Sequence, residues 1–164
     1  MRVLGIDSGS RVTGYGVIDG SGAGCSYVSC GIIRVRSTES LSHRLHSIYR
    51  GIMEVIESVQ PEAAAFEGIF YAQNVQSALK LGHVRGVCMA AVAEAKLPVF
   101  EYSPAEVKTA VTGYGRADKP QVQQMVTALL KLKIAPVEYD ASDALAVAIC
   151  HANSIRYNLA AGRS

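Results

Sequence analysis

The sequence predicts an α/β fold: a five-stranded mixed sheet flanked by helices on both faces. Two short apolar runs, Val3–Ile6 and Ala63–Phe66, are each followed by an acid. Such runs are typical of strands buried on both faces of a sheet. Apolar residues then repeat with the helical period between Ser40 and Val59. Because helices separate the later strands, we expect a layered α/β arrangement in a single domain spanning residues 1–164.

Three strands are expected to open the chain. They are predicted at Arg2–Asp7, Arg11–Ile18 and about Cys25–Arg36. The Gly-rich stretch Asp19–Gly24 turns the chain between the second and third strands. Short links between successive strands predict an antiparallel meander. The amphipathic helix Ser40–Val59 follows, and Gln60-Pro61 ends it.

The second half of the chain alternates strands and helices. After the strand Ala63–Glu67 we expect a long helix at Asn74–Ala95 and a strand at Leu97–Tyr102. Two further helices are expected at Lys119–Lys131 and Asp140–Asn153. A short helix is also expected after Leu97–Tyr102, with Ser103 as its N-cap and Pro104 at its first position.

A stripe of small residues runs along the predicted long helix. Its members, spaced four apart, are Ala78, Gly82, Gly86 and Ala90. Each glycine costs the helix about 0.8–1 kcal/mol relative to alanine, so the close approach of another backbone is expected. Packing within the subunit is slightly favoured over contact with the same helix of a second subunit.

Bulk composition restricts the class of protein. No apolar run reaches the ~18 residues of a membrane span, and the N-terminus does not resemble a signal peptide, so a cytoplasmic protein is predicted. Its four cysteines form no CxxC pair and are expected to be reduced thiols. The net charge is only +2, but residues 108–133 hold five bases and one acid. This region suits either phosphate binding or an ordinary solvated surface.

Four carboxylates are candidates for one functional site. Asp7 and Glu67 end two buried strands that a helical crossover can make parallel neighbours, so the two side chains are expected to converge. Asp140 and Asp143 share one face at the start of the last helix, where they also suit an N-cap and the helix dipole. Together the four acids favour Mg²⁺ or Mn²⁺. Two such ions ~4 Å apart would serve phosphodiester hydrolysis.

Several motifs in order resemble the RuvC family of Holliday-junction resolvases over nearly the whole chain. The matching segments are Leu4–Asp7, Gly9–Gly16, Phe66-Glu67 with Phe70, Asn74 with Ser77–Gly82, Val107-Lys108, Gly113 and Gly115 with Lys119, and Asp140–Ala146. The sequence departs from the family pattern at Ser8, where the family commonly has Pro, and at Ser142, where it has Ala. Both replacements are small and leave the four acids in place.

The resemblance implies a ribonuclease-H-like fold and a homodimer that nicks four-way junctions symmetrically, leaving 5′-phosphate and 3′-hydroxyl ends. It implies roles in recombination and DNA repair, with the RuvA–RuvB branch-migration complex as partner. It assigns the metal and catalytic roles to Asp7, Glu67, Asp140 and Asp143. For DNA contacts it points to Lys108 and Lys119.

Other DNA contacts are predicted with alternatives left open. An aromatic side chain at Phe70, and less so at Tyr71, could stack on an unpaired junction base, or it could belong to the core. Arg116 belongs to the basic region, and Arg11 could contact DNA or form a surface salt bridge.

Three other functions fit parts of the pattern. Asp7 followed by Ser-Gly-Ser resembles the phosphate loop of actin- and hexokinase-like ATPases, although 164 residues are too few for their two domains. Ribonuclease H takes a glutamate from its first helix, where this chain has Glu54 and Glu57. A non-catalytic junction-binding module would have no use for four converging acids, which repel DNA.

Overall fold

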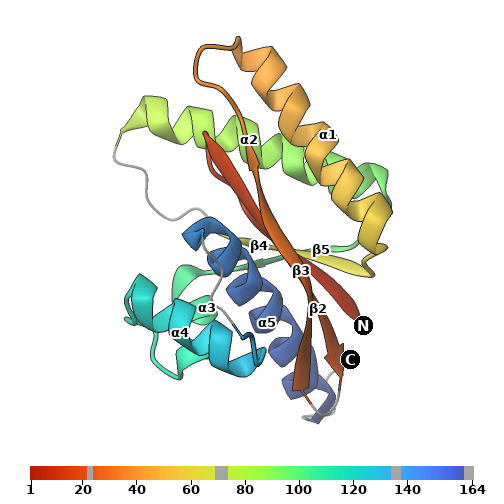
Figure 1. Cartoon of the computed structure of the whole chain (residues 1–164), viewed down its shortest axis with the longest axis vertical. Helices are drawn as coiled ribbons and strands as arrows, with labels where there is room; N and C mark the ends of the chain where they lie inside the picture. The colour runs from red at the N-terminus through yellow and green to blue at the C-terminus, as the bar shows by residue number, and fades with distance from the viewer. Residues whose placement is uncertain (22–23, 69–73, 134–137, 161–164) are drawn as a thin grey trace.

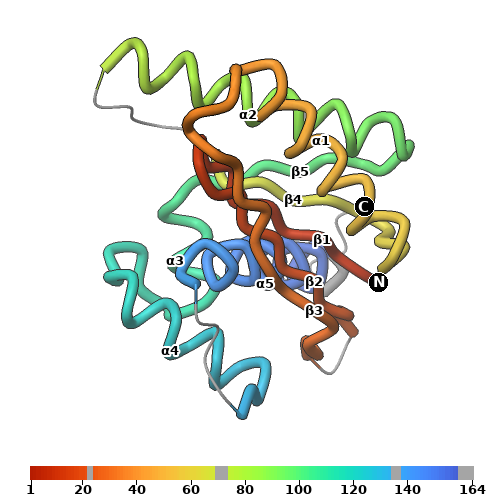
Figure 2. The backbone as a smooth tube through the Cα atoms, turned by 45° about the horizontal axis from the view of Figure 1, so that its top comes forward, coloured from red at the N-terminus to blue at the C-terminus, as the bar shows by residue number. Residues whose placement is uncertain are grey.

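A five-stranded mixed sheet forms the centre of the structure, a computed structural model that describes residues 1–21, 24–68, 74–133 and 138–160. Its strands are β1 (Arg2–Asp7), β2 (Val12–Ser21), β3 (Gly24–Arg34), β4 (Ala63–Glu67) and β5 (Val99–Tyr102). They lie in the order β3-β2-β1-β4-β5 (Figures 1 and 2). The pairs β1–β2 and β2–β3 are antiparallel, whereas β1–β4 and β4–β5 are parallel. Both the predicted meander and the predicted parallel pairing of the two acid-ending strands are confirmed.

Helices cover both faces of this sheet, as predicted. They are α1 (Leu41–Val59), α2 (Val75–Glu94), α3 (Pro104–Thr112), α4 (Lys119–Leu129) and α5 (Tyr139–Ala160). Helices α1 and α2 lie on one face, and α5 lies on the other with α3 and α4 outside it (Figures 1 and 2). Two hydrophobic cores result, one on each side of the sheet. Leu4 and Ile6 of β1 point into the α1–α2 core, and Val3 points into the other.

The backbone of α5 rests directly on glycines of β1 and β2. A Cβ atom added to Gly14 would lie 2.0 Å from the carbonyl oxygen of Asp140, and one added to Gly5 would lie 2.0 Å from that of Ala144. At Gly16 the nearest atom would be the Leu145 nitrogen, at 2.5 Å. No other residue type fits these positions without moving the helix or the sheet.

The N-termini of α3 and α5 differ in how well they match the capping residues that the sequence predicts. The prediction for α3 is confirmed, because Ser103 forms a capping box with Glu106 and Pro104 occupies the first turn. The N-cap role considered for Asp140 is wrong. Helix α5 begins at Tyr139, so Asp140 lies inside its first turn.

Helix α5 is also longer than predicted, ending at Ala160 instead of Asn153. The polar residues after His151 resemble a helix end, but the Ser154 hydroxyl donates 3.0 Å to the carbonyl of Cys150 within the helix. Such bonding to the preceding turn lets serine remain in a helix. Strand β2 likewise continues past Ile18 to Ser21, where it pairs with Gly24.

The preference for packing the small-residue stripe of α2 within the subunit is wrong. Among the described residues, nothing lies within 4 Å of a Cβ added to Gly82 or Gly86. The same exposed side of α2 carries two large apolar residues, Val75 at 75% exposure and Leu79 at 59%. This side of α2 therefore presents an apolar, closely approachable surface to solvent.

The described part of the chain has no helix that is long and apolar enough to cross a membrane.

Candidate active site

A cavity of about 260 Å³ lies at the ends of β1 and β4, between the sheet and the helices α3, α4 and α5. Three of the four predicted acids line it together with both predicted lysines: Asp7, Glu67, Asp143, Lys108 and Lys119. The rest of its wall is apolar, including Val107, Val122 and Ala146. Residues far apart in sequence thus bring opposite charges together in one apolar recess.

The sheet register explains why the acids meet. Ile6 pairs with Phe66 in the parallel ladder, so Asp7 and Glu67 follow as neighbours at the same edge. Asp7 also pairs with Gly14 on its other side. The carbonyl of Asp140 lies over Gly14, which places the start of α5 beside Asp7. Asp140 itself does not line the cavity, but its charge acts on Asp7.

Burial and mutual repulsion perturb the acids of this site. The pKa of Asp7 is raised from its ordinary 3.8 to about 7. Burial is the largest cause, and the charges of Asp143, Glu67 and Asp140 also contribute. Burial also raises the pKa of Glu67, followed by the charge of Asp143. A cation placed among these carboxylates would relieve both effects.

Lysines supply part of that positive charge. Lys119 Nζ donates to Asp143 Oδ2 at 2.8 Å, and this bond is the main reason that the pKa of Lys119 is raised. The charge of Lys108 lowers the pKa of Glu67, as does that of Lys119. Lys119 starts α4, whereas Lys108 comes from α3, so two separate helices carry positive charge to the acids.

The carboxylates of this site are the right type of ligand for a hard divalent cation, but in this structure they are too far apart to bind one in common. Carboxylate oxygens are the ligands that Mg²⁺ and Mn²⁺ prefer. Within the described ranges, however, no three acidic, histidine or cysteine side chains are close enough together to chelate an ion. The ammonium of Lys119 on Asp143 is the cation that the site holds in this structure. The acids would have to come closer together to bind a metal in common.

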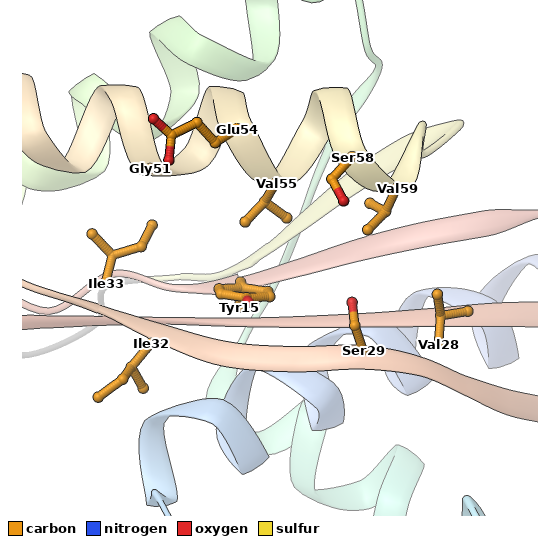
Figure 3. A pocket seen from close by; sticks show the side chains of 10 residues that line it. All are labelled: Tyr15, Val28, Ser29, Ile32, Ile33, Gly51, Glu54, Val55, Ser58 and Val59. Atoms are coloured by element: carbon orange, nitrogen blue, oxygen red, sulfur yellow. The ribbon is translucent and has the colours of Figure 1, made fainter.

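A larger hollow of about 460 Å³ lies on the opposite face of the sheet, between α1 and the strands β2 and β3 (Figure 3). Tyr15 and aliphatic side chains such as Ile33 and Val55 line it together with the polar residues Ser29 and Ser58. Its single acid is Glu54, on the helix where the ribonuclease H alternative would need a glutamate. Glu54 instead pairs with Arg50 at 3.5 Å, on the far side of the sheet from Asp7. The ribonuclease H arrangement of acids is therefore absent from the described residues.

One neighbour of the acids is not indicated by the sequence pattern. It is Arg85 of α2, whose side chain is only 11% exposed. Its Nη1 donates to the carbonyl of Glu67 at 2.6 Å, and its Nη2 pairs with Glu101 Oε2 at 2.7 Å. Nothing in the local sequence pattern signals these contacts, because they join three elements through the tertiary fold.

The remaining predicted DNA contacts have separate outcomes. Phe70 and Tyr71 lie outside the described residues, so stacking by these rings stays a prediction. Arg11 and Arg116 are exposed, at the start of β2 and before α4. Neither lines the cavity of the acids.

Comparison with known proteins gives a consistent family. Residues 3–151 match the family model of the crossover junction endodeoxyribonuclease RuvC. The protein of that name from Syntrophotalea carbinolica is 55% identical over 158 residues, covering 96% of this chain and 98% of the relative. The one from Geobacter sulfurreducens is 56% identical, covering 94% of this chain and 93% of the relative.

Solved structures agree with these sequences. Thermus thermophilus RuvC in complex with a Holliday junction substrate is 34% identical, with a TM-score of 0.91, and the alignment covers 96% of each chain. The yeast mitochondrial Holliday junction resolvase Ydc2 shares the fold at 16% identity, with a TM-score of 0.64 over 96% of this chain and 78% of that one. These neighbours confirm the ribonuclease-H-like fold. With its acids at the ends of β1 and β4 and its match over residues 3–151, this chain belongs to the RuvC family of crossover junction endodeoxyribonucleases.

Proposed function

We propose that this chain resolves four-way DNA junctions by hydrolysing one phosphodiester in each of two opposed strands. The products are 5′-phosphate and 3′-hydroxyl ends, and the process serves recombination and DNA repair. The observation that carries the proposal is the recess where Asp7, Glu67 and Asp143 meet two lysines. Family membership supplies the substrate, because a relative of the same fold has been solved with a Holliday junction.

The proposed metal ligands are Asp7, Glu67, Asp140 and Asp143. The raised pKa values of Asp7 and Glu67 support this assignment, because a divalent cation would stabilise the ionised form of both. We assign Mg²⁺ as the natural ion, with Mn²⁺ as a substitute and two ions in each site. Such ions activate a water molecule and stabilise the departing oxygen of a phosphodiester.

The lysines are proposed to place the scissile phosphate against the acids. Lys108 is half-buried in the cavity wall, whereas Lys119 is exposed and reaches in from the start of α4. Lys119 Nζ donates to Asp143 in this structure, and if Asp143 held a metal instead, the ammonium would be free to contact a phosphate oxygen. Arg11 and Arg116 are assigned to the DNA backbone farther from the cut, and Phe70 and Tyr71 to unpaired bases.

Paired cuts need two sites, so we propose that the active form is a homodimer. The exposed apolar side of α2 supports this assembly, because Gly82 and Gly86 leave room for a second backbone. Leu79 and Val75 on the same helix offer apolar area to bury. From family membership we also propose contact with the RuvA–RuvB branch-migration complex, which pull-down with those two proteins tests.

Substitution of Asp7 by Asn tests the assignment of chemistry. We expect Asp7→Asn to bind a synthetic four-way junction as the parent does and to lose cleavage in Mg²⁺, because the amide removes one charged ligand from the site. Glu57→Gln, an exposed acid on α1, is the matched control and should cleave normally. Gel-shift and cleavage assays on the same labelled junction measure both properties.

The substrate panel separates the proposal from its alternatives. A duplex and an RNA–DNA hybrid are incubated beside the junction, each with Mg²⁺ or with EDTA. Preference for the hybrid would support ribonuclease H and overturn junction resolution, and activity that survives EDTA would overturn the metal assignment. Binding or turnover of ATP would instead indicate the ATPase class.

A further inference from the structure

Arg85 joins three elements around the end of β4. It lies on α2, and its guanidinium reaches the carbonyl of Glu67 on β4 and the carboxylate of Glu101 on β5. The two nitrogen–oxygen distances are 2.6 and 2.7 Å. The Arg85 side chain is 11% exposed and its bond to the Glu67 carbonyl is part-buried, whereas Glu101 is 54% exposed and its bond lies nearer to solvent. Charge-assisted bonds of this kind are among the stronger hydrogen bonds in proteins.

The sheet places these partners side by side. Glu101 pairs with Phe66, the residue before Glu67, and Tyr102 pairs with Glu67 itself. The guanidinium carbon also lies 5.3 Å from the centroid of the Phe66 ring, within the range of a cation–π contact. Arg85 therefore contacts the last two residues of β4 from the α2 side, through the Phe66 ring and the Glu67 carbonyl.

Only an arginine can make this arrangement. Its planar fork carries separate donors for two acceptors, whereas lysine ends in a compact ammonium. Glu67 is the last residue of β4, and just beyond it the Gly68 amide donates to the Tyr102 carbonyl at 2.7 Å. The carboxylate of Glu67 thus extends from a strand end whose direction is fixed by the guanidinium.

We propose that Arg85 is a positioning residue for the metal site: by anchoring the Glu67 carbonyl to Glu101, it fixes the direction in which the Glu67 carboxylate meets the ions. This inference rests on the proposed function, because it takes Glu67 to be a metal ligand. Groups that orient metal ligands through hydrogen bonds commonly change metal affinity or activity by about 10–100-fold when they are removed.

Metal binding without DNA gives a readout that a merely structural role would not move. Calorimetric titration of the protein with Mn²⁺ is the measurement, and Arg85→Met and Arg85→Lys are the variants. Both are expected to bind Mn²⁺ about 10-fold or more weakly, because methionine has no donor and the donors of lysine share one nitrogen, whereas Arg85 reaches its two acceptors from two separate nitrogens. Arg50→Met, which breaks an exposed ion pair on α1, is the matched control and should bind as the parent does.

The Glu67→Gln variant distinguishes the metal-ligand role of Glu67 from the positioning role of Arg85. If Glu67→Gln leaves Mn²⁺ binding unchanged, Glu67 is not a ligand and the proposed site is wrong. If Glu67→Gln weakens binding but folded Arg85→Met matches Arg50→Met, only the positioning role is overturned. Cooperative thermal unfolding establishes that each variant is folded. Should Arg85→Met fail this check, Arg85→Lys decides, and parental Mn²⁺ affinity in that variant overturns the role.

Discussion

At the residue scale, the charged side chains around the acid site fall into two groups. Arg85 donates to Glu67 and Glu101, and Lys119 donates to Asp143. Asp7 and Glu67 are buried with neighbours of the same sign, so their pKa values rise. Strongly perturbed carboxylates of this kind cluster at functional sites, which is why the acids, and not the larger apolar hollow, mark the site.

His151 gives a residue-scale prediction outside the site. It is wholly buried, its Nδ1 lies 2.7 Å from the Tyr102 hydroxyl, and burial lowers its pKa from 6.5 to about 4. In the unfolded chain His151 is therefore protonated below pH ~6.5, whereas in the folded chain it stays neutral down to pH ~4. The stability due to neutral His151 is complete above pH 6.5 and is lost as the pH falls toward 4.

We expect this effect to cost about 2 kcal/mol of unfolding free energy between pH 7 and pH 5. Urea titrations at the two pH values measure it. In His151→Phe the decline should shrink by that amount, whatever the absolute stability of the variant. His46→Phe, an exposed position on α1, should keep the parental decline. An equal decline in His151→Phe would show that another group is responsible.

At the element scale, the contact of α5 with the sheet decides where the acids stand. Helix α5 carries Asp140 and Asp143, and β1 carries Asp7. At Gly5 and Gly14 the nearest atoms of α5 are all backbone atoms, so helix and sheet approach each other there backbone to backbone. The start of α5 is thereby held beside the end of β1.

Gly14→Ala tests this element contact. The added Cβ would lie 2.0 Å from the Asp140 carbonyl oxygen, so the start of α5 must shift. We expect a loss of about 1–3 kcal/mol in unfolding free energy, together with weaker Mn²⁺ binding. Urea unfolding and calorimetry measure the two effects.

Ser47→Ala, at an exposed position on α1, is the control. Alanine favours a helix by up to about 0.7 kcal/mol over serine, so this variant should be at least as stable as the parent. Parental stability and Mn²⁺ affinity in Gly14→Ala would contradict the idea that α5 is held by this contact.

At the scale of the whole molecule, the two faces of the sheet carry different features. The face of α3, α4 and α5 forms the acid site, whereas the face of α1 and α2 ends in an exposed apolar surface. Arg85 links the two, since it starts from α2 and ends on the strand that carries Glu67. The proposed subunit contact and the acid site are thus joined by one side chain.

Leu79→Glu tests the assembly. Leu79 is 59% exposed in the subunit, so a glutamate there should leave the fold intact but place a charge in the proposed contact. We expect sedimentation to show monomers where the parent is dimeric, and junction cuts to become unpaired. Leu41→Glu, at a 39% exposed position on α1, should stay dimeric. A dimeric Leu79→Glu would place the contact elsewhere.

The sequence was sufficient for features that depend on local pattern and topology. Strands β1 and β4 show as apolar runs ending in acids, and one crossover makes Asp7 and Glu67 neighbours. The contacts of Arg85 and the pairing of Lys119 with Asp143 were not predictable, because they join residues 16 or more apart through the tertiary fold. The outward side of α2 was misjudged because small residues mark a close contact without identifying the partner.

The glycine contacts under α5 bear on how this enzyme could be engineered. Since the nearest atoms of α5 at Gly5, Gly14 and Gly16 belong to its backbone, aliphatic residues of the α1–α2 core, across the sheet from the acids, can be exchanged without resizing the acid site. A heat-resistant variant redesigned in that core should therefore keep its cutting geometry, provided that these three glycines and the apolar wall of the acid cavity are left as they are. Adaptation to temperature and preservation of chemistry are separable in this fold.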